Sequence, residues 1–213
     1  MKKHLDGRTV KGQRISKQGR ESILRAYIAL IRSGVPSPTA REIAERAGLS
    51  IRVIFKHFPN LRTLRLESFA RLQAQSSKFF AGNPPERASA LERLEFFVNK
   101  HARRLEFVTP LHRTAAMVES IDPDVADAIR AAREAARRDL ERALGASLDD
   151  FPPSKRRDLV TALHIICSWE AWQILRVHYR MSSKRARRFV IGTALAMLAQ
   201  AERTIRAAQK RLR

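Results

Sequence analysis

The chain has 213 residues, of which 44% are apolar and 30% charged, the composition of a folded globular protein with one large or two small domains. Its 42 lysines and arginines outnumber 21 acidic residues, giving a net charge of +21 and a sequence pI near 11.5. This excess favours nucleic acid or an acidic membrane surface as a partner, although a basic surface with no particular partner has the same composition.

The chain lacks the features of a secreted, disulfide-bonded or membrane protein. Cys167 is the single cysteine, which excludes an intramolecular disulfide and a multi-cysteine metal site, and its apolar neighbours predict a buried thiol. Residues 1–8 lack the apolar core of a signal peptide, and no apolar run approaches the ~18 residues of a membrane span. We therefore expect a soluble cytoplasmic protein with no membrane partner.

Helical periodicity dominates the chain from Lys17 onward. Residues 1–16 are polar and basic with little periodicity, which predicts a flexible arm; a solvated tail and a segment that follows the DNA backbone are both compatible with it. No alternating strand pattern appears anywhere, and a first helix ends at Gly34, before Pro36 and Pro38. The predicted fold class is all-α.

Residues 39–58 predict two short helices joined by a tight turn. Thr39 with Glu42 three residues later forms a capping-box pattern at the start of the first helix. Gly48 tolerates the positive φ of a sharp turn, and Ser50 is a favourable N-cap for the next helix. This order is typical of a helix-turn-helix, which presents its second helix to the major groove of DNA.

The strongest break in the chain is Gly82-Asn-Pro-Pro85, which predicts a boundary between domains at residues 17–81 and 85–213. A helix capped by Asn60 precedes this break and ends near Phe80. Up to residue 81 there are 17 basic and 5 acidic residues, a net +12, against 25 and 16, a net +9, in the longer remainder. The charge is therefore denser around the helix-turn-helix.

The second domain is predicted to be helical to its end. Its expected helices span Glu86–Phe107, a segment starting at Pro110, Pro123 to about Gly145, residues 154–181 and residues 183–211.

The second helix of the motif has an inner and an outer side. At about 100° per residue, Ile54 and Phe58 face inward, whereas Arg52 and Lys56 lie together outside, with Val53 and His57 beyond them. The two cations can neutralise phosphates or donate to guanine, and Ile51 and Val53 can contact thymine methyl groups. An ordinary helical hairpin with a solvated charged face is the alternative.

Residues 17–77 resemble the DNA-binding domain of the tetracycline-repressor (TetR) family. The matching elements are Thr39, Ile43-Ala44, Ala47-Gly48-Leu49-Ser50, Phe55-Lys-His-Phe-Pro59 and Leu64. The chain departs from the family pattern where Phe55 replaces tyrosine, Val53 replaces threonine, and Leu61 replaces lysine, although Arg62 follows. The later helices match the family's second domain in length and layout.

The resemblance implies that the chain binds double-stranded DNA as a two-fold homodimer. The residues expected at the DNA are Thr39, Ala40, Arg41, Ser50, Ile51, Arg52, Val53, Phe55, Lys56, His57 and Arg62. It also implies that the last two helices form the dimer interface. Their apolar positions fit intrachain core equally well: Leu159, Leu163, Ile166, Ile174, Val190, Ala194, Leu195 and Leu198.

Family members commonly bind a small effector in the second domain, so the resemblance implies a pocket for a small hydrophobic molecule there. The candidate lining residues are Phe96, His101, Phe107, Met117, His164, Cys167, Trp169 and Trp172, for each of which ordinary core is the alternative. Tyr179 is a further candidate. The last four of the eight lie in one predicted helix, which is the expected pocket wall.

The predicted function is that of a dimeric repressor released from a palindromic operator by a small effector. The alternative is a basic protein that binds nucleic acid or organises chromosomes without sequence preference. The chain has no glycine-rich phosphate loop, paired histidine metal spacing or nucleophile–base signature. We therefore expect no enzyme activity, catalytic residue, metal site or cofactor, and we attribute the acidic residues around Asp122-Pro123 to helix capping.

Overall fold

The structure is a computed structural model that describes residues 7–80, 84–149 and 151–211, and within these ranges it contains helices and turns but no strand. The prediction of an all-α chain is thereby confirmed. Contacts between residues divide the chain into two compact units. The head unit comprises Met1–Ala74 and Pro110–Ile129, and the body unit comprises Gln75–Thr109 and Arg130–Arg213.

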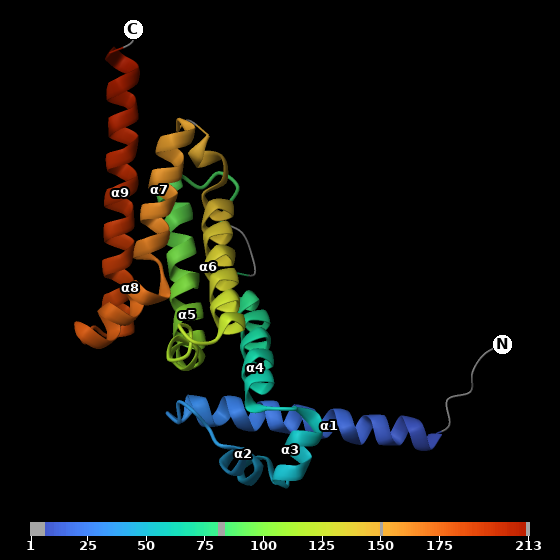
Figure 1. Ribbon diagram of the computed structural model, residues 1–213. Helices are drawn as coiled ribbons and strands as arrows, with labels where there is room; N and C mark the ends of the chain where they lie inside the picture. Colours follow the sequence, from blue (N-terminus) through green and yellow to red (C-terminus); the bar gives the residue numbers. More distant parts are fainter. Residues whose placement is uncertain (1–6, 81–83, 150, 212–213) are drawn as a thin grey trace, which may run out of the picture. The chain divides into compact units, whose positions relative to one another are not determined.

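The head unit is built on the first four helices, α1 (Gly7–Arg32), α2 (Ala40–Ala47), α3 (Ile51–His57) and α4 (Leu61–Ser76). Helix α1 packs against both α2 and α3, which lie on the same side of it in Figure 1. Their shared core consists of buried apolar side chains: Ile23, Leu24, Tyr27, Ile31, Ile43, Ile54, Phe58 and Leu64.

The first helix begins at Gly7, earlier than the predicted start at Lys17. Residues 7–16, expected as part of an arm, are helical, whereas residues 1–6 lie outside the described part of the chain. Adding a turn to an existing helix costs far less free energy than starting one, so a polar segment without a proline can extend α1 even though it lacks an apolar stripe. The predicted end of this helix is confirmed, since α1 ends at Arg32 and Gly34, two residues later, has a φ of 97°.

The body unit contains parts of α5 (Ala90–Ala116) and α6 (Pro123–Leu144), followed by α7 (Pro153–Ile166), α8 (Trp169–Gln173) and α9 (Ser183–Arg211). Short helical turns occupy Ser77–Phe80, Gly145–Leu148 and, in π-helical form, Ile174–His178. Apolar side chains from α5, α6, α7, α8 and α9 form one continuous core. Figure 1 shows α5, α6, α7 and α9 running side by side within this unit.

The prediction of a helix that starts at Pro110 is wrong, because α5 runs through this proline without a break. A proline inside a helix costs about 3 kcal/mol, through a lost hydrogen bond and a clash with the preceding turn. Burial of the flanking Leu105, Val108 and Leu111 offsets that cost. The Thr109 hydroxyl also donates to the Leu105 carbonyl at 2.6 Å, which gives that oxygen an additional donor next to the proline.

The predicted helix 154–181 is also wrong, since it is interrupted at Cys167-Ser168. Ser168 has extended backbone angles (φ −67°, ψ 161°), and its hydroxyl accepts from the Ala171 N–H at 3.1 Å, so it ends one helix and caps the next. Serine caps a helix better than it continues one, because its side chain competes for backbone hydrogen bonds. The final helix agrees with its prediction.

The sequence-based domains were continuous stretches, whereas residues 110–129 cluster with the head unit. A break such as Gly82–Pro85 shows where the backbone turns. It carries no information about which distant segment packs on which, and Pro110 and Pro123 predict helix starts but not the unit to which residues 110–129 belong.

Candidate nucleic-acid interface

Helix α2 is capped at both ends as the sequence predicts. The Thr39 hydroxyl accepts from the Glu42 N–H at 3.3 Å, and the Glu42 carboxylate accepts from the Thr39 N–H at 2.8 Å. The hydrogen bonds that the Thr39 N–H and hydroxyl donate to the Glu42 carboxylate hold the pKa of Glu42 below its ordinary value. Gly48 ends the helix in the left-handed region (φ 65°, ψ 35°), where a side chain would be strained.

Helix α3, the second helix of the helix-turn-helix, starts immediately after this turn. The Ser50 hydroxyl accepts from the Val53 N–H at 3.4 Å, and the predicted N-cap is therefore confirmed. Ile54 and Phe58 are fully buried, which fixes the rotation of the helix about its axis.

Arg52 and Lys56 are exposed on α3, on the side away from the buried pair. Ile51 and Phe55 are also exposed, at 43% and 46%. The helix therefore presents both cations and apolar groups to solvent, the combination that can contact phosphates and thymine methyl groups together.

Arg20 of α1 holds the end of α3, and no sequence pattern indicated this role. Its Nη1 donates to the His57 carbonyl at 2.6 Å, and its guanidinium lies 4.2 Å from the centre of the Phe58 ring. Its Nε and Nη2 both donate to the Glu67 carboxylate on α4. One side chain thus joins three helices. Its partners are 37 and 47 residues away, so local periodicity could not reveal them.

His57 packs against α1 instead of extending the outer row of cations. A Cβ atom placed on Gly19 would lie 2.9 Å from His57 Nε2, so a larger residue at this point of α1 would displace the ring. Burial, followed by the charges of Arg20 and Lys56, lowers the pKa of His57. The ring is half-buried, which makes it a poorer candidate for DNA contact than Lys56.

The other residues expected at the DNA also lie in the head unit. Thr39, Arg41 and Ser50 are exposed, and Ala40 and Val53 are partly exposed. Arg62, at the start of α4, is exposed but forms ion pairs with Asp122 and Asp124.

Three residues expected to line an effector pocket are buried and bonded within the body core. The His101 Nε2–H donates to the Cys167 carbonyl at 2.8 Å, and its ring stacks on Phe97 with 5.0 Å between centres. Burial raises the pKa of the Cys167 thiol to about 12, so this thiol is unreactive. Trp172 is 2% exposed and donates through Nε1 to Glu106 at 2.9 Å.

The remaining candidate lining residues are dispersed. Trp169 is half-buried and donates to the Thr109 hydroxyl at 3.2 Å, and Phe107 lies against Phe79 with 5.3 Å between ring centres. Phe96 is covered by the Lys100 ammonium at 4.3 Å. His164 is half-buried in α7, Tyr179 is 60% exposed, and Met117 is 61% exposed in the head unit.

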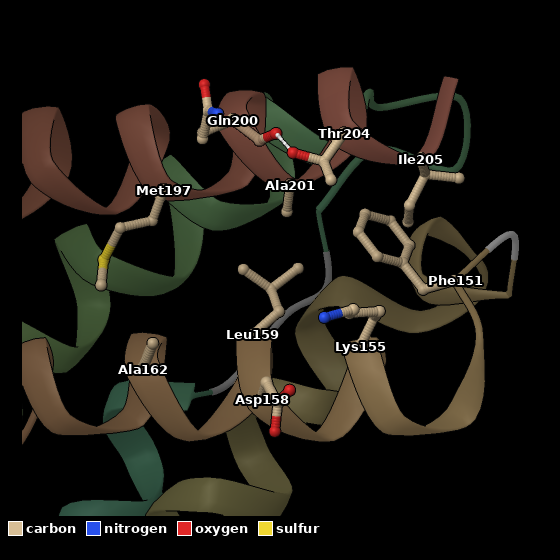
Figure 2. Close-up of a pocket in the computed structure, with 10 residues that line it drawn as sticks. All are labelled: Phe151, Lys155, Asp158, Leu159, Ala162, Met197, Gln200, Ala201, Thr204 and Ile205. Atoms are coloured by element: carbon tan, nitrogen blue, oxygen red, sulfur yellow. Dashed lines mark hydrogen bonds between the residues drawn. The ribbon is translucent and has the colours of Figure 1, made fainter. Parts of the chain in front are cut away.

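A pocket of about 410 Å³ lies between α7 and α9 (Figure 2). Leu159, Met197 and Ile205 contribute apolar surface to it, and the Thr204 hydroxyl on its α9 side donates to the Gln200 carbonyl at 2.9 Å. The sequence did not indicate this pocket, because its lining comes from segments that α8 and the turn Ile174–His178 separate in the chain and none of its residues carries unusual chemistry. None of the predicted lining residues takes part in it.

The burial of His101 predicts a pH-dependent stability. Burial, reinforced by the positive charge of Arg104, lowers the pKa of His101 from 6.5 to about 3. Below pH 6.5 the unfolded chain therefore takes up a proton that the folded chain does not, and stability falls as the pH falls. Between pH 7 and pH 5 this histidine should remove about 2 kcal/mol from the free energy of unfolding.

Urea titrations of the wild type and of His101→Gln at both pH values test this prediction. Glutamine can still donate to the Cys167 carbonyl but does not titrate. The variant should therefore lose about 2 kcal/mol less of its free energy of unfolding between pH 7 and pH 5 than the wild type does. Equal losses in the two proteins would contradict the assignment.

The basic charge is not confined to the head unit. The head unit contains 17 basic and 9 acidic residues, a net +8, whereas the body unit contains 25 and 12, a net +13. Lys184, Arg185, Arg187 and Arg188 at the start of α9 form no ion pair with any residue that the structure describes. The body unit therefore also has unneutralised cations on its surface.

Two further features of the described residues concern membrane spans and metal ligands. In residues 7–80, 84–149 and 151–211, no helix combines the length and apolarity needed to cross a membrane. Across the same ranges, His, Cys, Asp and Glu side chains do not gather in groups of three that could hold a metal ion.

No family model matches the chain, and no curated protein sequence matches it. The fold does match solved structures. A TetR-family transcriptional regulator of Streptomyces coelicolor superimposes with a TM-score of 0.70 at 16% identity, over 92% of this chain and 88% of that one. A protein of Rhodococcus sp. described as a TetR-family transcriptional regulator has a TM-score of 0.65 at 15% identity, over 84% and 98% of the two chains.

A protein of Saccharomonospora viridis described as a transcriptional regulator, solved in complex with choline, has a TM-score of 0.67 at 20% identity, over 82% of this chain and 94% of that one. These similar structures are all described as transcriptional regulators. The chain thus has the fold of the TetR-family transcriptional regulators.

Proposed function

We propose that this protein is a TetR-family transcriptional regulator that binds a palindromic operator as a homodimer and represses transcription there. The observation that carries the proposal is the capped helix-turn-helix, in which buried Ile54 and Phe58 hold Arg52 and Lys56 on the exposed side of α3. A short rigid helix with outward cations after a glycine turn suits insertion into the major groove.

In this proposal the head unit supplies two kinds of contact. Exposed hydroxyls and N–H groups at the starts of α2 and α3, at Thr39 and Ser50, position the unit on phosphates. Arg52, Lys56 and the neighbouring apolar groups face the base edges. Phe55 offers ring contact where family members use a tyrosine hydroxyl, so backbone N–H groups and Arg41 become more important for holding phosphates.

For the dimer we propose an interface on the last two helices. Most of the apolar positions expected there are buried within their own chain, including Leu163 of α7 and Val190 of α9. Phe189, Gly192 and Ala196 of α9 are exposed apolar or small residues that are spaced as one helical stripe. This stripe supports close approach of a second copy.

Phe189→Glu should therefore weaken self-association roughly tenfold or more, because it places a charge in an apolar contact. Phe189→Leu, which keeps the position apolar, should remain close to the wild type. Sedimentation of each variant over a dilution series measures the association constant. If Phe189→Glu associates as strongly as the wild type, the interface lies elsewhere.

A small effector that releases the operator completes the proposed function. The choline complex of the Saccharomonospora viridis protein is a precedent for a ligand in this fold. Such a molecule must bind the DNA-free form more tightly than the DNA-bound form. Since His101, Cys167 and Trp172 are packed core residues, we assign them no ligand contact.

Selection of bound duplexes from a random DNA pool, repeated at increasing NaCl concentration, tests the function directly. If the protein is a sequence-specific regulator, the selection should yield a palindromic consensus, and the preference for that sequence should persist as the NaCl concentration rises. Recovery of no consensus would rule out operator recognition.

The same experiment examines the alternative, a protein that binds nucleic acid without sequence preference. The net +13 of the body unit and its unpaired cations on α9 favour this second candidate. It predicts that affinity falls steeply with salt and is equal for selected and mixed-sequence duplexes. Replacement of Lys184, Arg185 and Arg188 by glutamine should then weaken binding to both duplexes, whereas an operator-specific head should retain its preference.

A further inference from the structure

An ion-pair cluster within the head unit joins the start of α4 to the start of α6; we call it the Arg62 cluster. The Arg62 Nε and Nη2 donate to the two oxygens of Asp122, each at 2.9 Å, and Nη2 lies 2.5 Å from an oxygen of Asp124. Arg62 is the second residue of α4, which begins shortly after α3 ends at His57. A cation expected at the DNA is thus engaged by two carboxylates of its own chain.

Asp122 is held in place independently of Arg62. Its carboxylate caps α6 by accepting from the N–H groups of Asp124 at 3.2 Å and Val125 at 3.4 Å. Its side chain is 11% exposed, and the hydrogen bond from Arg62 is the largest cause of its lowered pKa. The two N–H groups at the start of α6 therefore hold the carboxylate in position whether or not the arginine remains on it.

Arg62 is bound but accessible, since its side chain is 47% exposed. A guanidinium offers a planar fork of N–H groups that binds a carboxylate or a phosphate in the same two-point geometry. The two N–H groups that hold Asp122 cannot hold a phosphate at the same time. Asp122 and a phosphate therefore compete for this edge of the guanidinium.

We propose that Asp122 and Asp124 compete with DNA phosphate for Arg62, so that the head unit binds DNA at full strength only when this ion pair opens. The inference rests on the proposed DNA-binding function and describes how the same interface is regulated. Any change that displaces the start of α6 would free one cation at the DNA-binding unit, and DNA binding would in turn favour that displacement.

The composition of the head unit supports this competition. Residues 110–129 contain one basic residue, Arg113, against four acidic ones, whereas residues 1–74 contain 16 basic and 5 acidic residues. The segment that packs with the basic head is therefore acidic, with a net −3. Exposed ion pairs contribute little to free energy in water, so the competition should change affinity roughly two- to tenfold and leave the fold intact.

The test replaces Asp122 and Asp124 by asparagine in the full chain. Asparagine keeps the side-chain oxygen that caps α6, so the charge is removed without removing the cap. Affinity for a fluorescent mixed-sequence duplex is measured over a series of NaCl concentrations. The double variant should bind roughly two- to tenfold more tightly. A plot of the logarithm of its binding constant against the logarithm of the salt concentration should be steeper, by the amount expected for about one additional phosphate contact.

Two comparisons separate this mechanism from a general gain in positive charge. In an Arg62→Gln background the double asparagine substitution should produce no gain in affinity. Asp127→Asn removes one charge from the same segment at an exposed residue that is not a partner of Arg62, and it provides the charge-matched control for Asp124→Asn. Any gain from Asp127→Asn should be the same with and without Arg62.

Unchanged affinity in the double variant, or a gain that persists in the Arg62→Gln background, would overturn the competition. In either case DNA binding by the wild type in the same titration leaves the proposed function standing. If none of these proteins binds DNA, both proposals fail together. Far-UV circular dichroism of each variant verifies that α4 and α6 remain helical.

Discussion

Arg20→Ala should lower the free energy of unfolding of the head unit by about 2–3 kcal/mol, because it removes charge-assisted hydrogen bonds to His57 and Glu67 together with the contact on the Phe58 ring. The side chain is 38% exposed, so solvent screens part of the ion pair and a larger loss is not expected. The end of α3 would lose its anchor on α1. Urea unfolding gives the stability, and amide hydrogen exchange in α3 shows where it is lost.

Two variants separate this role from the loss of a surface charge. Arg20→Lys keeps the charge but has no planar fork, so it should be destabilised almost as much as Arg20→Ala. Arg71→Ala removes a single ion pair between α4 and α1, with Glu21, and should cost less than about 1 kcal/mol. Equal stability of Arg20→Lys and the wild type would show that charge alone suffices at this position.

Arg52→Ala combined with Lys56→Ala should weaken binding to the selected operator at least roughly thirtyfold, since each contact of this kind contributes about 1–3 kcal/mol. Both side chains are exposed and lie on the outer side of α3, so helical content and self-association should not change. If Arg52 or Lys56 contacts a base, its removal should relax the sequence preference at that position of the operator. A residue that binds a phosphate lowers affinity for all sequences and reduces the salt slope.

The matched control removes two cations from the body unit, with Arg138→Ala and Arg157→Ala, both exposed. If the head unit carries recognition, this control should retain operator affinity within a few-fold. Should the two double variants weaken binding equally, general electrostatic attraction would explain the affinity, and the recognition surface would not be α3.

Local chemistry made the helix-turn-helix predictable from the sequence. The cap of Thr39 by Glu42, the glycine turn at Gly48 and the cap at Ser50 each involve residues within a few positions of one another. The inward positions of Ile54 and Phe58 follow from helical period alone. Such features depend on backbone geometry that a short segment determines by itself, and the structure confirms each of them.

Two helix boundaries predicted from the sequence, at Pro110 and within residues 154–181, differ from those of the structure. Pro110 is a strong local signal for a helix start, but the burial of its neighbours keeps α5 continuous. The helix predicted over residues 154–181 is instead divided by a local signal, because the Ser168 hydroxyl caps a new helix. His101 and Trp172 have hydrogen-bond partners within the body unit, and no sequence pattern indicated the pocket between α7 and α9, whose lining is mostly apolar.

By itself the sequence determined the fold class, the position of the two-helix motif and which side of its second helix faces outward, because capping and periodicity act over a few residues. Only the tertiary structure decided that Arg20 anchors α3 and that Arg62 is held by Asp122, since these partners are 37 to 60 residues apart. An arginine has the same local signature whether it faces solvent, a carboxylate or a phosphate. Its partner is chosen by which distant helix the packing of apolar faces brings beside it.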